Sequence, residues 1–347
     1  MSAAVVGQPS VMRILWTHNF DPHVANSGVF VHKTAEGVRA RGIDLHLEYL
    51  GNLRSMRQLM RARRHVKRLA RDFDLVHAQF GSACGLVTSV VEGIPKIVTI
   101  RGSDWNIHKA SRGFFYFHTQ MASAFSKFSI RSYDAILAVS HRVAAELRQF
   151  APRAYVDVSP SPIDLARFVP RDKREARALL GFPDCTEKWV LFNSLRLQNP
   201  IKRFELAKQA FDIAQERLGN LRLRVATGLD HESMPLFVAA CDLVLCTSDN
   251  EGWPNSVKEA LACNVPFVAT DVSDLRDISS IEPSCRVCPA DAKKIADGIC
   301  EVLSLPDPRN LRQHLSGMSV DAISDQLIAI YQSLLTRQDD SGVVARP

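Results

Sequence analysis

The stretch over residues 250–271 constrains the fold most, because it predicts a loop, a helix and a buried strand in immediate succession. It reads NEGWPNSVKEALACNVPFVATD. The first glycine and proline break regular structure, and either Asn255 or Ser256 can cap the helix expected over 257–263. An Asn-x-Pro sequence ends that helix, and the apolar run over 266–270 is typical of a buried strand. Helices that alternate with buried strands indicate an α/β protein with a parallel sheet.

Two glutamates flank the start of this helix. Glu251 precedes it, and Glu259 lies eight positions later, about two turns along. The free N–H groups and positive dipole end of a helix attract an anion, whereas carboxylates accept hydrogen bonds from hydroxyls. The pattern predicts a site for a ligand with both phosphate and hydroxyl groups. Taken singly, each glutamate is also explained by a capped helix with an exposed acidic residue.

The complete stretch resembles the Glu-x7-Glu signature of retaining family-4 glycosyltransferases. The resemblance implies the GT-B fold, in which two Rossmann-like, doubly wound parallel-sheet domains face a central cleft and the C-terminal helix returns to the N-terminal domain. It also implies transfer of a sugar from a nucleotide-sugar donor, a UDP- or GDP-sugar, with retention of configuration. No metal or other cofactor is obligatory in such a reaction.

The remaining sequence predicts how the two domains divide. Strand-like runs alternate with helical ones from residue 11 to residue 335, and the segment over 161–168 resembles the family's interdomain crossover. We expect an acceptor-side domain over 1–163 and a nucleotide-sugar-binding domain over 164–347, with 336–347 as a disordered tail. A short connection over 227–231 predicts that the second domain lacks one strand–helix unit, and 278–288 is expected to be an edge element.

Two residues of the first domain match family positions near the donor. Gly28 stands at a strand-to-helix turn, where the resemblance implies close approach of the backbone to the donor phosphates; a glycine needed only for the turn is the alternative. Arg101 occupies the place of the family's histidine, in an Arg-Gly-Ser-Asp run. An arginine does not serve as a base at neutral pH, but it can donate hydrogen bonds to phosphate or sugar oxygens.

Cations and glutamates of the second domain complete the predicted site. The resemblance assigns the diphosphate to Arg196 and Lys202, whose charge would stabilise the leaving group as the glycosidic bond breaks. Arg203, the adjacent cation, is the residue that could most easily be confused with Lys202 when the diphosphate role is assigned from the sequence. Glu251 is expected to contact the hydroxyls of the transferred sugar and Glu259 those of the ribose. Four further residues are expected near the donor through their backbone or the nucleoside: Gly228, Asn255, Ser256 and Val257.

Composition excludes several other classes of protein. The 347 residues are 46% hydrophobic and 23% charged, as in ordinary globular proteins. The eight cysteines are scattered, no secretory signal is recognisable, and one CxxC over 285–288 has no second ligand pair, so we expect free thiols, a cytoplasmic protein and no zinc. The longest uncharged run, over 78–91, is too short for a transmembrane helix.

Positive charge is concentrated in the first half of the chain. Residues 1–163 contain 21 Lys and Arg against 11 Asp and Glu, whereas residues 164–347 contain 22 against 26. The segment from Arg54 to Arg71 holds eight cations and no acid, on a predicted helix with an apolar side that includes Met56 and Met60. It could simply pack on the sheet, or it could bind an anionic membrane surface, which would make the protein peripheral on the inner face of the cytoplasmic membrane.

We therefore expect a lipid-linked or cell-envelope glycan as the acceptor and no nucleic-acid partner; the oligomeric state stays open. Two alternative enzymes share features with this prediction. A nucleotide-sugar 2-epimerase would use the same fold and donor, and a nucleic-acid-modifying glycosyltransferase would explain the basic first half. A non-catalytic partner protein fits least, because the diphosphate cations and both glutamates are present.

Overall fold

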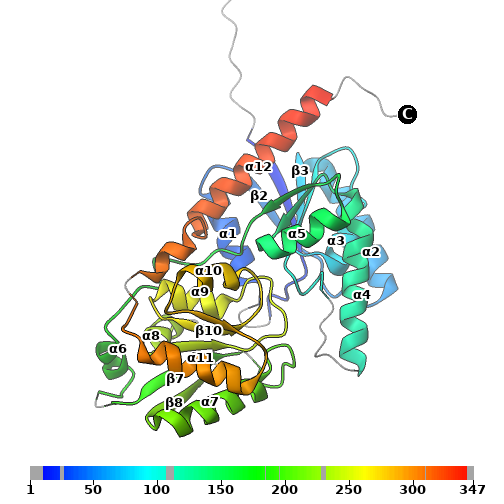
Figure 1. Ribbon diagram of the computed structural model, residues 1–347. Coiled ribbons are helices and arrows are strands. Elements are labelled where there is room, and N and C mark those ends of the chain that lie inside the picture. Colours follow the sequence, from blue (N-terminus) through cyan, green and yellow to red (C-terminus); the bar gives the residue numbers. More distant parts are fainter. Residues whose placement is uncertain are drawn as a thin grey trace, which may run out of the picture.

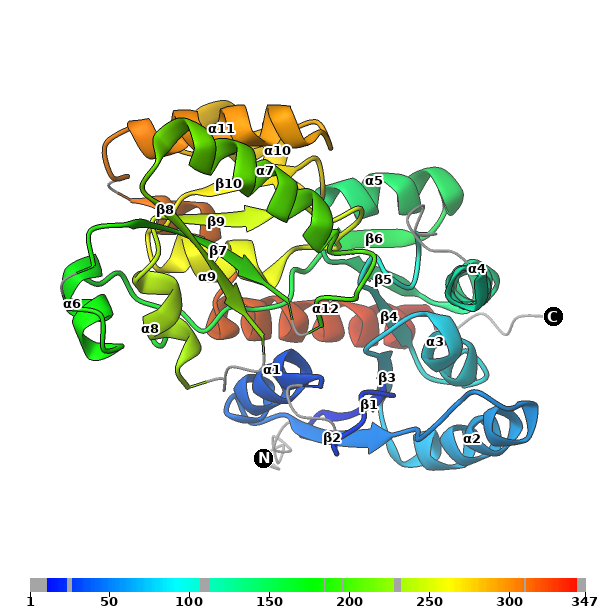
Figure 2. The ribbon, with the colours of Figure 1, turned by 90° about the horizontal axis from the view of Figure 1, so that it is seen from below.

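The computed structural model describes residues 11–23, 27–106, 113–183, 185–194, 196–227, 232–308 and 310–341. Within these residues the chain forms two parallel β-sheets, each covered by helices on both faces (Figures 1 and 2). The strand orders are β2-β1-β3-β4-β5-β6 in the first sheet and β11-β10-β9-β7-β8 in the second. The GT-B architecture expected from the sequence is confirmed.

The first sheet and its helices alternate in chain order. Its strands are β1 (Arg13–His18), β2 (Asp44–Tyr49), β3 (Leu75–Ala78), β4 (Lys96–Ile100), β5 (Ala135–Ala138) and β6 (Tyr155–Val158). Its helices are α1 (Val29–Arg39), α2 (Met56–Leu69), α3 (Ser82–Thr88), α4 (Gly113–Ser129) and α5 (His141–Phe150), with 3₁₀ turns η1 (Ala70–Asp72) and η2 (Ile130–Ser132). The sequence did not predict β6, because this short edge strand buries only Val156.

The second sheet repeats this alternation with one strand fewer. Its strands are β7 (Lys188–Asn193), β8 (Leu221–Ala226), β9 (Leu243–Cys246), β10 (Phe267–Thr270) and β11 (Arg286–Cys288). Its helices are α6 (Lys173–Leu179), α7 (Phe204–Leu218), α8 (Met234–Ala239), α9 (Asn255–Ala262), α10 (Leu275–Ile281) and α11 (Ala292–Ser304), followed by η3 (Leu311–Leu315). The element expected over 278–288 is the end of α10 together with the edge strand β11.

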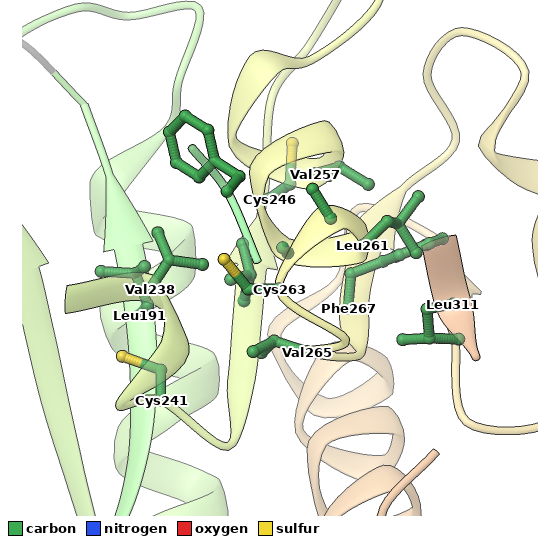
Figure 3. Close-up of a cluster of buried hydrophobic side chains, with 14 of the residues drawn as sticks. Leu191, Val238, Cys241, Cys246, Val257, Leu261, Cys263, Val265, Phe267 and Leu311 are labelled. Carbon is green, nitrogen blue, oxygen red and sulfur yellow. The ribbon is translucent and has the colours of Figure 1, made fainter. Parts of the chain in front are cut away.

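Helix α9, which contains the second glutamate, is fixed by its apolar face. Val257 and Leu261 are fully buried and share one core cluster with Cys246 of β9 and Phe267 of β10 (Figure 3). The helix begins two residues earlier than expected: Pro254 is the N-cap residue, so neither Asn255 nor Ser256 is the cap. The fixed backbone of a proline suits this position, and no side chain of the described residues caps α9.

The C-terminal helix α12 (Val320–Ser341) returns to the first domain, as expected (Figure 1). Its Tyr331 hydroxyl accepts a hydrogen bond from Trp16 Nε1 at 3.0 Å and lies 2.8 Å from His77 Nδ1. Burial lowers the pKa of His77 to about 3, so this core imidazole is neutral.

The predicted disordered tail over 336–347 is wrong in its first half. Helix α12 continues to Ser341, and Gln338 Nε2 donates a hydrogen bond to the carbonyl of Gly93. This contact with the first domain supplies the tertiary support that sequence periodicity did not reveal. Residues 342–347 lie outside the described residues.

Candidate active site

Lys202 and Glu251 meet at the carboxyl ends of the strands of the second sheet. Lys202 follows β7 and Glu251 follows β9, and their Nζ and Oε1 atoms lie 2.5 Å apart. Ser248 Oγ donates a second hydrogen bond to the same carboxylate oxygen at 2.8 Å. Burial acts to lower the pKa of Lys202, but the Glu251 carboxylate raises it overall. The ammonium therefore stays charged and fixed in place at the carboxyl edge, where ligands of parallel sheets bind.

Glu259 lies on α9 within electrostatic reach of the same lysine. Asn193 Nδ2, at the end of β7, donates a hydrogen bond to Glu259 Oε2 at 3.2 Å. Burial raises the pKa of Glu259 to about 7, although Lys258, Lys202 and Asn193 act in the opposite direction. The structure thus brings together Lys202, Glu251 and Glu259, which the sequence placed in one site.

Donor affinity should depend on pH through Glu259. If Glu259 receives the ribose hydroxyls, as the sequence predicts, its ionised form offers two acceptor oxygens, whereas the protonated form turns one of them into a donor. The pKa near 7 leaves the carboxyl mostly protonated at pH 6. Affinity for the UDP- or GDP-sugar should therefore rise about tenfold between pH 6 and pH 8. Calorimetric titration measures this change; the same slope in Glu259→Gln would contradict it.

Helix α9 begins four residues after Glu251 and offers backbone amides at its amino end. The first N–H groups of a helix have no partner within it, and Asn255 and Ser256 supply the first two. The amide of Val257 donates to the carbonyl of Pro254, and its side chain is in the core. Contact of this backbone with phosphate or sugar stays a prediction.

The guanidinium of Arg203 is engaged in hydrogen bonds with the protein's own backbone. Arg203 begins α7 in the left-handed region, with φ 49°, and donates to the carbonyls of Thr247 and Ser248 at 2.8 Å each. It therefore fixes the loop that leads to Glu251. Arg196, by contrast, has an exposed side chain, and its diphosphate role stays a prediction. Gly228 lies outside the described residues.

The structure explains Gly28 without a ligand. Its φ is +69°, and an added Cβ would lie 2.7 Å from Cβ of Phe20. Both the turn and the close packing of Phe20 require a glycine here. An approach of this backbone to the donor phosphates stays a prediction.

Arg101 binds protein groups through each of its nitrogens. Nε donates to the carbonyl of Gln79 at 2.8 Å and Nη2 to its Oε1 at 3.1 Å, while Nη1 donates to Ser161 Oγ at 2.8 Å. The guanidinium also lies 4.2 Å from the ring centroid of Phe30. Burial lowers its pKa to about 10, which still leaves it charged at neutral pH. The predicted donation to the substrate would have to use its remaining N–H groups.

The two domains touch at a pair of glycines. A Cβ on Gly252 would lie 2.1 Å from the carbonyl oxygen of Arg101, and one on Gly102 would lie 2.8 Å from Cα of Gly252. Nearby, the Asp274 carboxylate accepts hydrogen bonds from the amides of His141 and Arg142 at the start of α5. Glu251 is therefore held directly beside the loop that follows β4.

Sequence reasoning missed three residues of this group: Asn193, Ser248 and Lys258. Asn193 is the last residue of β7 and Ser248 follows β9, and polar residues at the carboxyl ends of parallel strands are a usable signal. Lys258 is completely buried, which no helical periodicity would predict for a lysine.

Two further observations concern the described residues alone. In the described ranges, no group of three or more His, Cys, Asp or Glu side chains could hold a metal ion. Within the same ranges, no helix has both the length and the apolar character needed to cross a membrane.

The fold defines a class of protein, the two-domain GT-B proteins, and comparison with known proteins agrees. The model described as Glycosyltransferase Family 4 matches residues 14–167, and the model described as Glycosyl transferases group 1 matches residues 209–305. Each half of the chain is thus similar to a glycosyltransferase family model.

Relatives and solved structures extend this comparison. The chain is 29% identical over 246 residues to TuaC of Bacillus subtilis strain 168, a glycosyltransferase assigned to teichuronic acid biosynthesis; the match spans 65% of this chain and 60% of TuaC. Sucrose-phosphate synthase from Thermosynechococcus elongatus has a similar structure, with a TM-score of 0.75, 18% identity and coverage of 94% of this chain and 100% of that one. Anabaena HepE, solved with UDP and glucose, has a TM-score of 0.66 and 16% identity, over 93% of this chain and 100% of HepE.

Proposed function

We propose that the protein transfers a sugar from a UDP- or GDP-sugar to a lipid-linked or other cell-envelope glycan, with retention of anomeric configuration. The contact between Lys202 and Glu251, beside the amino end of α9 and Glu259, carries this proposal. It offers a cation for the diphosphate and carboxylates for hydroxyls. HepE, which binds UDP and glucose, and TuaC, assigned to an envelope polymer, support the choice of donor and acceptor.

The proposed chemistry occurs on one face of the sugar. The bond between C1 and the donor phosphate oxygen breaks, and the electron pair leaves with the diphosphate. The acceptor hydroxyl attacks C1 from the same face and passes its proton to that phosphate oxygen. Lys202 stabilises the charge that develops on the diphosphate, while Glu251 orients the hydroxyls of the transferred sugar.

Replacement of Glu251 tests this role. We expect Glu251→Ala to lower turnover of the nucleotide sugar at least about 100-fold, because the sugar loses its hydrogen-bond acceptor beside Lys202. Donor turnover followed by NMR measures this loss. Glu216→Ala, on the exposed side of α7, is the control and should act like the wild type. Intact turnover in Glu251→Ala would overturn the assignment, and conversion of the donor to an epimer without acceptor would favour the isomerase alternative.

The basic face of α2 supports binding to an anionic membrane. Helix α2 packs inward through a narrow stripe of Leu59, Ala62 and Val66. Met56 and Met60, predicted on the apolar side, are instead 73% and 44% exposed, because that stripe is narrower than expected. Six arginines on or next to this helix are exposed, and no ion pair is found for them among the described residues: Arg54, Arg57, Arg61, Arg64, Arg68 and Arg71.

Helix α4 adds an apolar stripe on the same side of the domain. Phe117, Met121 and Phe128 are 58%, 40% and 77% exposed, and their spacing places them on one side of the helix. Figures 1 and 2 show α2, α3 and α4 side by side. Exposed arginines on α2 and exposed aromatic residues on α4, the two helices that flank α3, are features of a surface that lies in a lipid interface.

Vesicle binding tests this surface. Changing Arg57, Arg61, Arg64 and Arg68 to Gln should weaken binding to vesicles with anionic lipid by about two to three orders of magnitude, since each cation contributes about 1 kcal/mol. Binding is measured by co-sedimentation with anionic and with zwitterionic vesicles. The control changes four exposed cations of the second domain to Gln: Arg174, Lys208, Lys293 and Lys294. Equal binding of both variants would contradict a membrane role for α2.

A further inference from the structure

Lys258 is a completely buried lysine at the junction of the two domains. It lies on α9 directly before Glu259, and its Nζ donates a hydrogen bond to the carbonyl of Ser161 at 2.6 Å. The ammonium also lies 5.9 Å from the ring centroid of Trp253. Burial lowers the pKa of Lys258 to about 7, although Glu259 and Glu251 oppose this change. Burial of a lysine costs free energy of desolvation, which a methionine of similar length would not. The contacts of Lys258 therefore point to a specific role for this side chain.

Ser161 lies on the segment that crosses between the domains. It follows β6 of the first sheet, and two residues later Ile163 pairs with Ser319, just before α12. The Ser161 hydroxyl accepts the hydrogen bond of Arg101, whose loop belongs to the first domain. One residue of the crossover is thus held by the first domain through its side chain and by α9 through its carbonyl.

Arg101 also takes part in the contact between the two domains at Gly252. Arg101 lies against Gly252 through its carbonyl oxygen, and Gly252 follows Glu251 directly. A rotation about the crossover would therefore change the position of both glutamates relative to the first domain. The Lys258 contact opposes such a rotation, because it joins the helix of Glu259 to the crossover itself.

We propose that Lys258 is a positioning residue that ties α9 to the interdomain crossover and so sets the angle at which the two domains meet. The inference rests on the proposed function only for its effect on turnover. Lys202 and Glu259, which bind the nucleotide in this scheme, both belong to the second domain. Loss of the contact should therefore displace the first domain, which binds the acceptor, relative to the bound donor. The affinity for the nucleotide should stay unchanged.

Three variants of the full chain separate positioning from a simple structural role. Lys258→Met removes the donor, Lys258→Gln keeps a neutral donor that is one atom shorter, and Ser161→Ala removes the Arg101 contact but keeps the carbonyl. The readouts are affinity for UDP and for GDP, the radius of gyration from small-angle X-ray scattering, and kcat for donor turnover.

At pH 9, where Glu259 stays ionised without the nearby Lys258 charge, we expect Lys258→Met to keep its nucleotide affinity within about twofold, to show a larger radius of gyration and to lose about 10- to 100-fold in kcat. Lys258→Gln, with its shorter donor, should recover part of both losses, and Ser161→Ala should resemble the wild type. Wild-type scattering by Lys258→Met would overturn the proposal. Loss of nucleotide affinity in Lys258→Met would also overturn it, because that result indicates general destabilisation. If the wild type turns over no donor, the proposed function fails, while the scattering comparison still decides the positioning role.

Discussion

Replacement of Gly252 by alanine should abolish sugar transfer while leaving nucleotide binding intact. The added Cβ would lie 2.1 Å from the carbonyl oxygen of Arg101 and 2.6 Å from Cγ2 of Val139. The first of these is a backbone atom, so the contact cannot be relieved by a side-chain rotation. The domains must separate at this point, and a small displacement of aligned reactants already costs about 100-fold in rate.

Steady-state transfer and nucleotide titration on the same preparation measure this effect. Gly85→Ala is the matched control, because its added Cβ would lie 3.5 Å from its nearest neighbours, an ordinary contact inside α3. We expect this control to retain activity. Full transfer by Gly252→Ala would show that the contact between the domains is not needed for catalysis.

Lys202→Met should lower kcat about 100- to 1,000-fold. The ammonium is fixed by Glu251 beside the amino end of α9, where it can stabilise negative charge that grows on the leaving diphosphate. Because this charge is larger in the transition state than in the bound donor, kcat should fall more than donor affinity. Rapid-quench turnover with saturating donor measures the change.

The control for this variant is Lys208→Met, on the exposed side of α7, where Lys208 pairs with Asp212. A second variant, Lys202→Met with Glu251→Gln, tests whether the loss comes only from an unpaired carboxylate. If the double variant recovers wild-type turnover, Lys202 serves only to neutralise Glu251.

Much of the fold could be predicted because the buried strands are short apolar runs between helical patterns. Strand β10 (Phe267–Thr270), for example, lies within the apolar run that predicted a buried strand over 266–270. Strand β6 lacks an apolar run, since it borders the sheet on one side only. The length of α12 depends on its contact with Gly93, which is distant in the sequence.

The structure brings the predicted residues together where charged side chains and strand ends coincide. Lys202, Glu251 and Glu259 follow or face the carboxyl edge of one sheet, and the structure brings them together. Arg101 binds groups on two distant segments of the chain, and only the folded arrangement shows that its nitrogens are already engaged. Lys258 could not be found from the sequence for the same reason.

Retention of configuration is the central claim, and the anomeric coupling of the product tests it most directly. Proton NMR of the first product formed from an α-linked UDP- or GDP-sugar gives the coupling at C1 before mutarotation or further reaction. An α-linked product is the predicted result, because attack and departure occur on the same face of the sugar. A β-linked product would contradict the proposed reaction.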